Sequence, residues 1–207
     1  MASLVLTAGT LVTTPSAGQQ EFSGTIFTGA PTATTRGIIP TEQFYRIDTP
    51  VVGTQVTTAQ STFGVGVTLA SNTVYEFEYA FALSKTAGTT SHTISYGYGG
   101  TAILNGIMDL RSIMNNTAGN TIAGSGQPLM YVGSVGATAA TTSIVTAVWV
   151  AYALIKGTVS INTGGTFIPQ YTLSGAPGGA YTTVFGSYMK IKPIGVSGAN
   201  TSVGAWA

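Results

Sequence analysis

Glu76 and Glu78, in the segment VYEFEYAFAL, are the residues whose type and spacing best suit chemistry. On a strand, their Cα atoms would lie about 6.6 Å apart on one face. Carboxyl groups about 5 to 9 Å apart can hydrolyse a glycosidic bond, so a glycan depolymerase is one hypothesis. The alternative is a solvent-facing strand surface whose glutamates pair with Lys190 and Lys192 across strands. We favour this alternative, because a half-exposed strand carries polar residues at every second position.

The single histidine, His92, is the other candidate for catalysis. With Asp48 or Asp109 and one of the many serines, it would complete a nucleophilic triad. No Gly-x-Ser-x-Gly motif presents such a nucleophile, so a hydrogen-bonded histidine is the simpler interpretation. One histidine and no cysteine also exclude multihistidine and thiolate metal sites. We therefore predict no catalytic residue, no cofactor and no metal.

Charged side chains are scarce, with seven Lys or Arg and six Asp or Glu in 207 residues. Ordinary soluble domains carry roughly 25% charged residues. Because the basic residues form no cluster, nucleic acid is not an expected partner. The most apolar run, residues 144–155, is shorter than the ~20 residues that a membrane-spanning helix needs. The N-terminus lacks the pattern of a signal peptide, so we expect synthesis in the host cytoplasm and no membrane partner.

Strands must position these residues, because Thr, Val and Ile favour strands and the frequent glycines mark turns. In residues 74–83, aromatic residues alternate with the two glutamates, which predicts a half-buried strand. The segment HTISYGYGG is predicted to pair with it. Glycine-containing turns at residues 162–165 and 175–179 predict a three-stranded meander over residues 156–191. Together these strands predict an all-β antiparallel sandwich of the jelly-roll type.

Three further segments carry specific expectations. Apolar residues at helical spacing predict a short helix over residues 106–114. The strand at residues 148–155 is apolar on both faces, so it is either a central strand or part of a subunit interface. Residues 1–50 are predicted to form an extended N-terminal arm and a short hairpin, and residues 51–207 the sandwich. The predicted subunit-interface residues are Val148, Trp149, Val150, Tyr152 and Trp206. The predicted docking residues of the arm are Leu4, Val5, Leu6, Leu11 and Val12.

Four blocks of the sequence carry a resemblance to a known family. They are GTLVTTPSAGQQEFSG, TRGIIPTEQFYRI, residues 60–100 and residues 156–195. These blocks resemble a module of virion structural proteins of tailed bacteriophages, often found at the C-terminal end of tail-fibre-like chains. The resemblance is weakest over residues 102–143. It implies a β-rich, trimeric part on the outside of a phage particle, without established chemistry. Where relatives tend to carry Tyr-Asp-Gly after the glutamate, this chain has Phe22, Ser23 and Gly24 after Glu21.

Three functions are compatible with this resemblance. Because Met1 stands just before the module, with no fibre shaft, we expect a decoration or cement protein on the outer surface of the capsid. It would be a homotrimer that docks on the major capsid protein, or on another virion protein, through its uncharged arm and would resist salt. The alternative is a short tail fibre or receptor-binding protein that contacts host glycans through loops such as residues 115–126. A depolymerase using Glu76 and Glu78 is a minor alternative.

Overall fold

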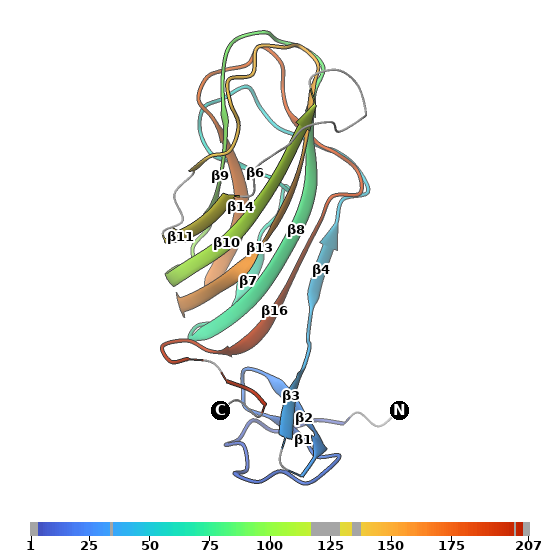
Figure 1. The fold of residues 1–207 in the computed structure, drawn as a ribbon, viewed down its shortest axis with the longest axis vertical. Coiled ribbons are helices and arrows are strands. Elements are labelled where there is room, and N and C mark those ends of the chain that lie inside the picture. The colour runs from blue at the N-terminus through green and yellow to red at the C-terminus, as the bar shows by residue number, and fades with distance from the viewer. Residues whose placement is uncertain (1–3, 34, 117–128, 134–137, 201, 205–207) are drawn as a thin grey trace.

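The computed structural model describes residues 4–33, 35–116, 129–133, 138–200 and 202–204. All regular secondary structure within these ranges is β-strand, and the strands pair in antiparallel fashion. Two sheets pack face to face as a sandwich, and a small third sheet lies at the lower end of the molecule in Figure 1. The predicted all-β sandwich is therefore confirmed. The described residues contain no helix that is long and apolar enough to cross a membrane.

The larger sheet of the sandwich has eight strands. They are β4 (Gln43–Arg46), β5 (Val51–Val52), β8 (Thr73–Lys85), β10 (Ile103–Asn116), β11 (Leu129–Gly133), β13 (Trp149–Thr163), β15 (Thr182–Thr183) and β16 (Tyr188–Val196). Strands β11, β10, β13 and β8 are neighbours in that order. On its other side, β8 pairs with two strands. Its first part pairs with β16, which pairs in turn with β4, and its last part pairs with β15, which pairs in turn with β5.

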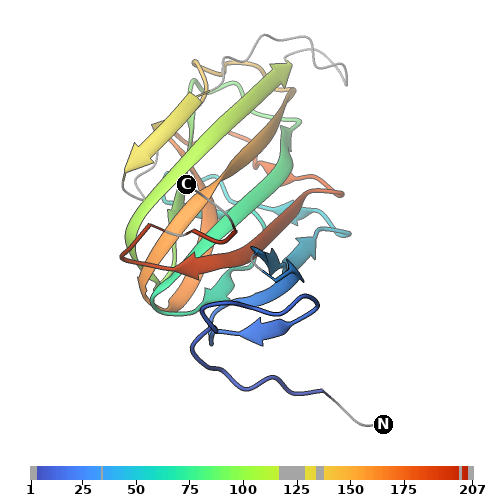
Figure 2. The ribbon, with the colours of Figure 1, turned by 60° about the horizontal axis from the view of Figure 1, so that its bottom comes forward.

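The opposing sheet has five shorter strands. They are β6 (Gln60–Ser61), β7 (Val67–Leu69), β9 (Ile94–Gly99), β12 (Thr138–Ala139) and β14 (Gly165–Leu173). The small third sheet contains β1 (Gln20–Phe22), β2 (Phe27–Thr32) and β3 (Thr35–Ile39), so the N-terminal region holds three strands rather than a short hairpin. Figure 2 shows this sheet beside the sandwich, with the N-terminal segment leading away from it. Strand β4 already belongs to the sandwich, because it pairs with β16.

The core lies between the two large sheets and is rich in aromatic rings. Strand β8 places Tyr75, Phe77, Tyr79, Phe81 and Leu83 in this core, as its alternating sequence predicts. Aromatic side chains of β9 and β14 pack against them from the other sheet: the ring centroids of Tyr98 and Phe167 lie 5.8 Å and 5.9 Å from that of Phe77. Strand β13 runs between β8 and β10 along its length, so it is a central strand of the large sheet. A subunit interface on its outer face stays a prediction.

The helix predicted over residues 106–114 is wrong, because this segment lies within β10. Its apolar residues fit both a helix and a strand, and pairing with β13 decides for the strand. In the strand, Ile107 and Ile113 face the core, whereas Met108 and Leu110 lie on the outer face. The two charged residues of this segment, Asp109 and Arg111, also point into the core, where they neutralise each other. A sequence pattern that assigns charges to solvent therefore misreads this segment.

The predicted meander and the predicted partner of β8 are also wrong. Gly164 alone separates β13 from β14, and bends follow β14 at residues 174–179, but β13, β14 and β16 are not neighbours in one sheet. The chain crosses from β13 in the large sheet to β14 in the opposing sheet. Strand β9, from HTISYGYGG, pairs with β14 and β12 rather than with β8. Alternation of apolar and polar residues identifies which face of a strand is buried. It does not identify the sheet to which the strand belongs, because the strands of both sheets bury one face in the same core.

Candidate interaction site

Glu76 and Glu78 lie on the outer face of β8, opposite lysines of β16. In the register of the two strands, Lys190 is the partner of Glu78 and Lys192 that of Glu76. The Nζ–carboxylate distances are 3.3 Å and 3.2 Å, respectively. Lys156 of β13 approaches Glu78 from the other side, at 2.6 Å. The cross-strand pairing predicted from the sequence is confirmed.

These contacts keep the Glu78 carboxylate ionised. The hydrogen bond from Lys156, aided by those from Tyr188 and Lys190, lowers the pKa of Glu78 to about 2. The Tyr188 hydroxyl donates to the carboxylate at 2.8 Å. A glycosidase needs one carboxyl group that holds a proton near neutral pH. The geometry therefore gives no support to Glu78 as such a proton donor.

His92 is not part of a triad with an aspartate. Its Nδ1 donates to the carbonyl of Thr90 at 2.7 Å, and the hydroxyl of Tyr181 donates to its Nε2 at 2.6 Å. Asp48 and Asp109 instead pair with Arg46 and Arg111. This is the hydrogen-bonded histidine that the sequence favours. Among the described residues, no group of three or more His, Asp or Glu could hold a metal ion.

An ion pair inside the sandwich core was not foreseen from the sequence. Asp109 and Arg111 of β10 are 1% and 2% exposed. The Arg111 guanidinium donates to both carboxylate oxygens, at 2.8 and 3.0 Å, and to the carbonyl of Tyr96 at 2.7 Å. The hydroxyl of Tyr98 also donates to Asp109. Burial raises the pKa of Tyr98 well above its usual value, so this hydroxyl keeps its proton.

Most charged side chains are neutralised within the chain. All of them lie in the described residues, and the ion pairs leave out only Glu42 and Lys85. Lys85 is buried and donates to the carbonyls of Gly88 and Thr146. Burial lowers its pKa. The surface is therefore poor in unpaired charge.

The outer face of the large sheet exposes apolar side chains on β10 and beside β13. Met108 and Leu110 are 48% and 49% exposed. Of the predicted interface residues, Val148 is exposed, and Val150 and Tyr152 are half-buried on this face. Trp149 points into the core and is 2% exposed, so its side chain is not available to a partner. Trp206 lies outside the described residues.

The N-terminal arm is anchored at its base and exposed at its tip. The amide of Gly9 donates to the carbonyl of Phe22 at 3.0 Å, and that of Val12 donates to the Glu21 carboxylate at 2.8 Å. Leu4 and Val5 are 84% and 78% exposed. The remaining predicted docking residues, Leu6 and Leu11, are half-buried, whereas Val12 is exposed. The tip therefore carries apolar side chains that this copy of the chain does not bury.

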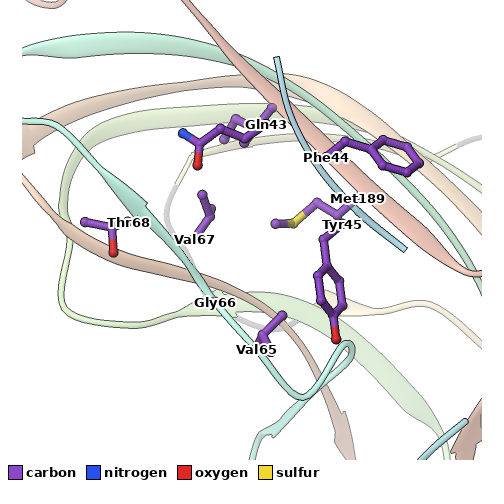
Figure 3. A pocket seen from close by; sticks show the side chains of 9 residues that line it. Gln43, Phe44, Tyr45, Val65, Gly66, Val67, Thr68 and Met189 are labelled. Carbon is purple, nitrogen blue, oxygen red and sulfur yellow. The ribbon is translucent and has the colours of Figure 1, made fainter. Parts of the chain in front are cut away.

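A groove of about 350 Å³ opens between β4 and the segment that leads into β7. Figure 3 shows side chains of β4 and β16 facing this segment across the groove, with Phe44 turned away. The lining residues are Gln43, Phe44, Tyr45, Val65, Gly66, Val67, Thr68, Met189 and Ile191. None of them carries a charge. No pattern in the sequence indicates this groove, because it arises where the edges of the two sheets diverge.

Comparisons with models of known families, with curated proteins and with solved structures found no match to this chain. The geometry of these surfaces and the resemblance of the four sequence blocks are therefore the grounds for assigning a function. Most of the loop predicted to touch glycans, residues 117–126, lies outside the described residues.

Proposed function

We propose that the chain is a structural protein of a bacteriophage particle, which decorates the outer surface of the head and stabilises the shell by non-covalent docking. The observation that carries this proposal is the exposed apolar tip of the arm, at Leu4 and Val5. Burying a Leu or Val side chain stabilises a complex by roughly 1.5–3 kcal/mol. The two adjacent exposed side chains offer this apolar area to a neighbouring protein.

The proposal includes a homotrimer that forms through the outer face of the large sheet. Met108 and Leu110 supply exposed apolar area on this face. The adjacent charges are three glutamates and three lysines, which balance one another. Copies can therefore bring this face together without net charge repulsion.

The number of copies in a purified particle tests the proposed location. A decoration protein is expected at a count comparable with that of the major capsid protein, measured by gel densitometry. A handful of copies per particle would contradict a role on the head. Docking through apolar and backbone contacts also predicts that most of the protein stays bound in 1 M salt, because salt screens charges but not apolar burial.

A short tail fibre or receptor-binding protein is the second candidate, favoured by a recess on the outer face. This recess has a volume of about 270 Å³ and lies over Ala80 and Ala82, with Tyr152, Phe185 and Tyr188 around it. Aromatic rings beside a shallow floor offer apolar faces and polar edges to a sugar ring. A trimer that buries this face would close the recess. Low copy number together with saccharide binding that Phe185→Ala abolishes would favour this candidate.

A further inference from the structure

From the sequence, the uncharged arm is expected to dock on the major capsid protein or on another virion protein, but the chain itself offers an apolar groove that suits the arm. We infer that the acceptor is a second copy of this chain, whose groove between β4 and β7 takes residues 4–8 as an added strand. This inference deepens the proposed function and rests on its assembly of copies, but it does not depend on where the protein sits in the particle.

The groove lies between two strand edges without partners. Strand β4 pairs with β16 alone, and β7 pairs with β14 alone, among the residues that the structure describes. Each is the outermost strand of its sheet on this side of the sandwich. An edge strand has unpaired N–H and C=O groups, which an extended peptide can bond by strand addition. The groove thus offers backbone groups along its sides.

The floor of the groove matches an apolar, uncharged occupant. Met189 and Ile191 of β16 belong to the core and form its buried side, and Val67 packs against the core from the other sheet. Val65 and Tyr45 are more exposed and lie at the rim. Because no charged residue lines the groove, a charged segment would lose hydration there without gaining an ion pair.

The tip of the arm has this chemistry. No charged side chain precedes Glu21 in the sequence. In an extended conformation, Leu4 and Leu6 lie on one face of the segment and Val5 on the other. Leu4 and Leu6 can therefore enter the groove together, while the backbone between them pairs with a free strand edge.

The geometry of the arm favours a groove in another copy. The arm is fixed to the small sheet at Gly9, so the five residues back to Leu4 extend by about 18 Å at most. In both Figure 1 and Figure 2, the N-terminal segment leads away from the sandwich. A segment that extends away from its own body reaches a neighbouring copy, and a ring closes when each arm enters the next groove.

Site-directed cross-linking tests this inference cleanly, because the chain has no cysteine. One full-length chain carries Leu4→Cys and an affinity tag, and an untagged full-length chain carries Val65→Cys. The two are mixed and treated with a short bismaleimide, which tolerates a range of sulfur–sulfur distances. We expect a covalent heterodimer at about twice the 21.0 kDa chain mass, whose peptide map joins position 4 of one chain to position 65 of the other. The matched control replaces Val65→Cys by Val196→Cys, an exposed site farther along β16, and should yield at least tenfold less heterodimer.

Two outcomes would overturn the inference. One is a heterodimer yield no higher than that of the Val196→Cys control. The other is a link within a single chain when Leu4→Cys and Val65→Cys are combined, since the arm would then occupy its own groove. Adding Leu6→Asp to the tagged chain should reduce the heterodimer about tenfold, because a charge cannot enter the apolar groove. If cross-linking fails but the copy number on the head is high, the groove is not the acceptor of the arm, and the proposed function still holds.

Discussion

Asp109 and Arg111 show how single residues determine the interior of this sandwich. Two opposite charges in a core lose hydration, and their attraction compensates only if the remaining polar atoms are also bonded. Here Tyr98 and the carbonyl of Tyr96 supply those bonds. The pair therefore fixes how β10 faces β9, since a shift of one residue in β10 would move both charges to the outer face.

Replacing one partner of this pair should be strongly destabilising. We expect Asp109→Asn to lower the free energy of unfolding by about 3–5 kcal/mol, because the buried guanidinium would lose its counter-charge. The combined change Asp109→Leu with Arg111→Met should cost less than Asp109→Asn alone, since it leaves no buried charge. Urea unfolding followed by circular dichroism measures both variants. A double variant that is the less stable of the two would contradict this account.

The Glu78 ion pairs predict a pH dependence of stability. The pKa of Glu78 is 4.5 in the unfolded chain and about 2 in the folded protein. Its contribution is therefore fully present above pH 4.5 and is lost as the pH falls through about 2. Because Lys156 is largely exposed, solvent screens the pair, and we expect Glu78→Gln to cost about 1 kcal/mol at pH 7.

Unfolding in urea at pH 7 and at pH 2 checks this value. The difference between Glu78→Gln and the parent protein should shrink to a small fraction of its pH 7 value at pH 2, because half of the folded-state Glu78 carboxylate is then protonated. Glu76→Gln is the matched control, since Glu76 has one lysine partner and a more exposed side chain. Its effect at pH 7 should be smaller. An equal loss in both variants would mean that the three contacts of Glu78 add nothing over a single ion pair.

At the scale of elements, strand faces follow from the sequence but strand partners do not. The alternation in β8 predicts its buried face, and the charges of β8 and β16 predict that these strands are neighbours. Spacing alone does not separate strand from helix in β10, because Ile107 and Ile113 fit both. The groove beside β4 was also beyond prediction, since it depends on where two sheet edges diverge. Pairing between distant segments determines each of these features.

Gly157 of β13 lies close to both β10 and β8, so replacing it tests how tightly these three strands pack. A Cβ atom there would overlap the carbonyl oxygen of Met108 on β10 and would lie 2.9 Å from the Phe77 ring on β8. We expect Gly157→Ala to lower the free energy of unfolding by at least ~2 kcal/mol, because backbone and ring must both move. Gly106→Ala on β10 is the control, since no atom lies within 4 Å of its added Cβ. Its effect should stay within ~1 kcal/mol. Thermal or urea denaturation compares the two, and equal losses would argue against this crowding.

At the scale of the whole molecule, the outer face of the large sheet predicts self-association. Light scattering should give the parent protein a mass about three times the 21.0 kDa of the chain. Leu110→Asp should reduce this mass, because it places a charge in the apolar part of the proposed contact. Val56→Asp changes an exposed residue outside the strands and should leave the mass unchanged. A monomeric parent protein would contradict the proposed trimer.

The position of β16 has a consequence for how the chain folds during synthesis. This strand completes the edge of β8 and is the only partner of β4 among the described residues, yet it follows every other strand of the described residues in the sequence. A ribosome must therefore translate the chain as far as Val196 before the large sheet can close. Until then, the edge of β8 stays open to pairing with other nascent chains. Folding that depends on such distant pairings is slow, on the order of milliseconds to seconds. Because charged side chains are scarce, the newly made chain is most prone to aggregation before β16 is synthesised.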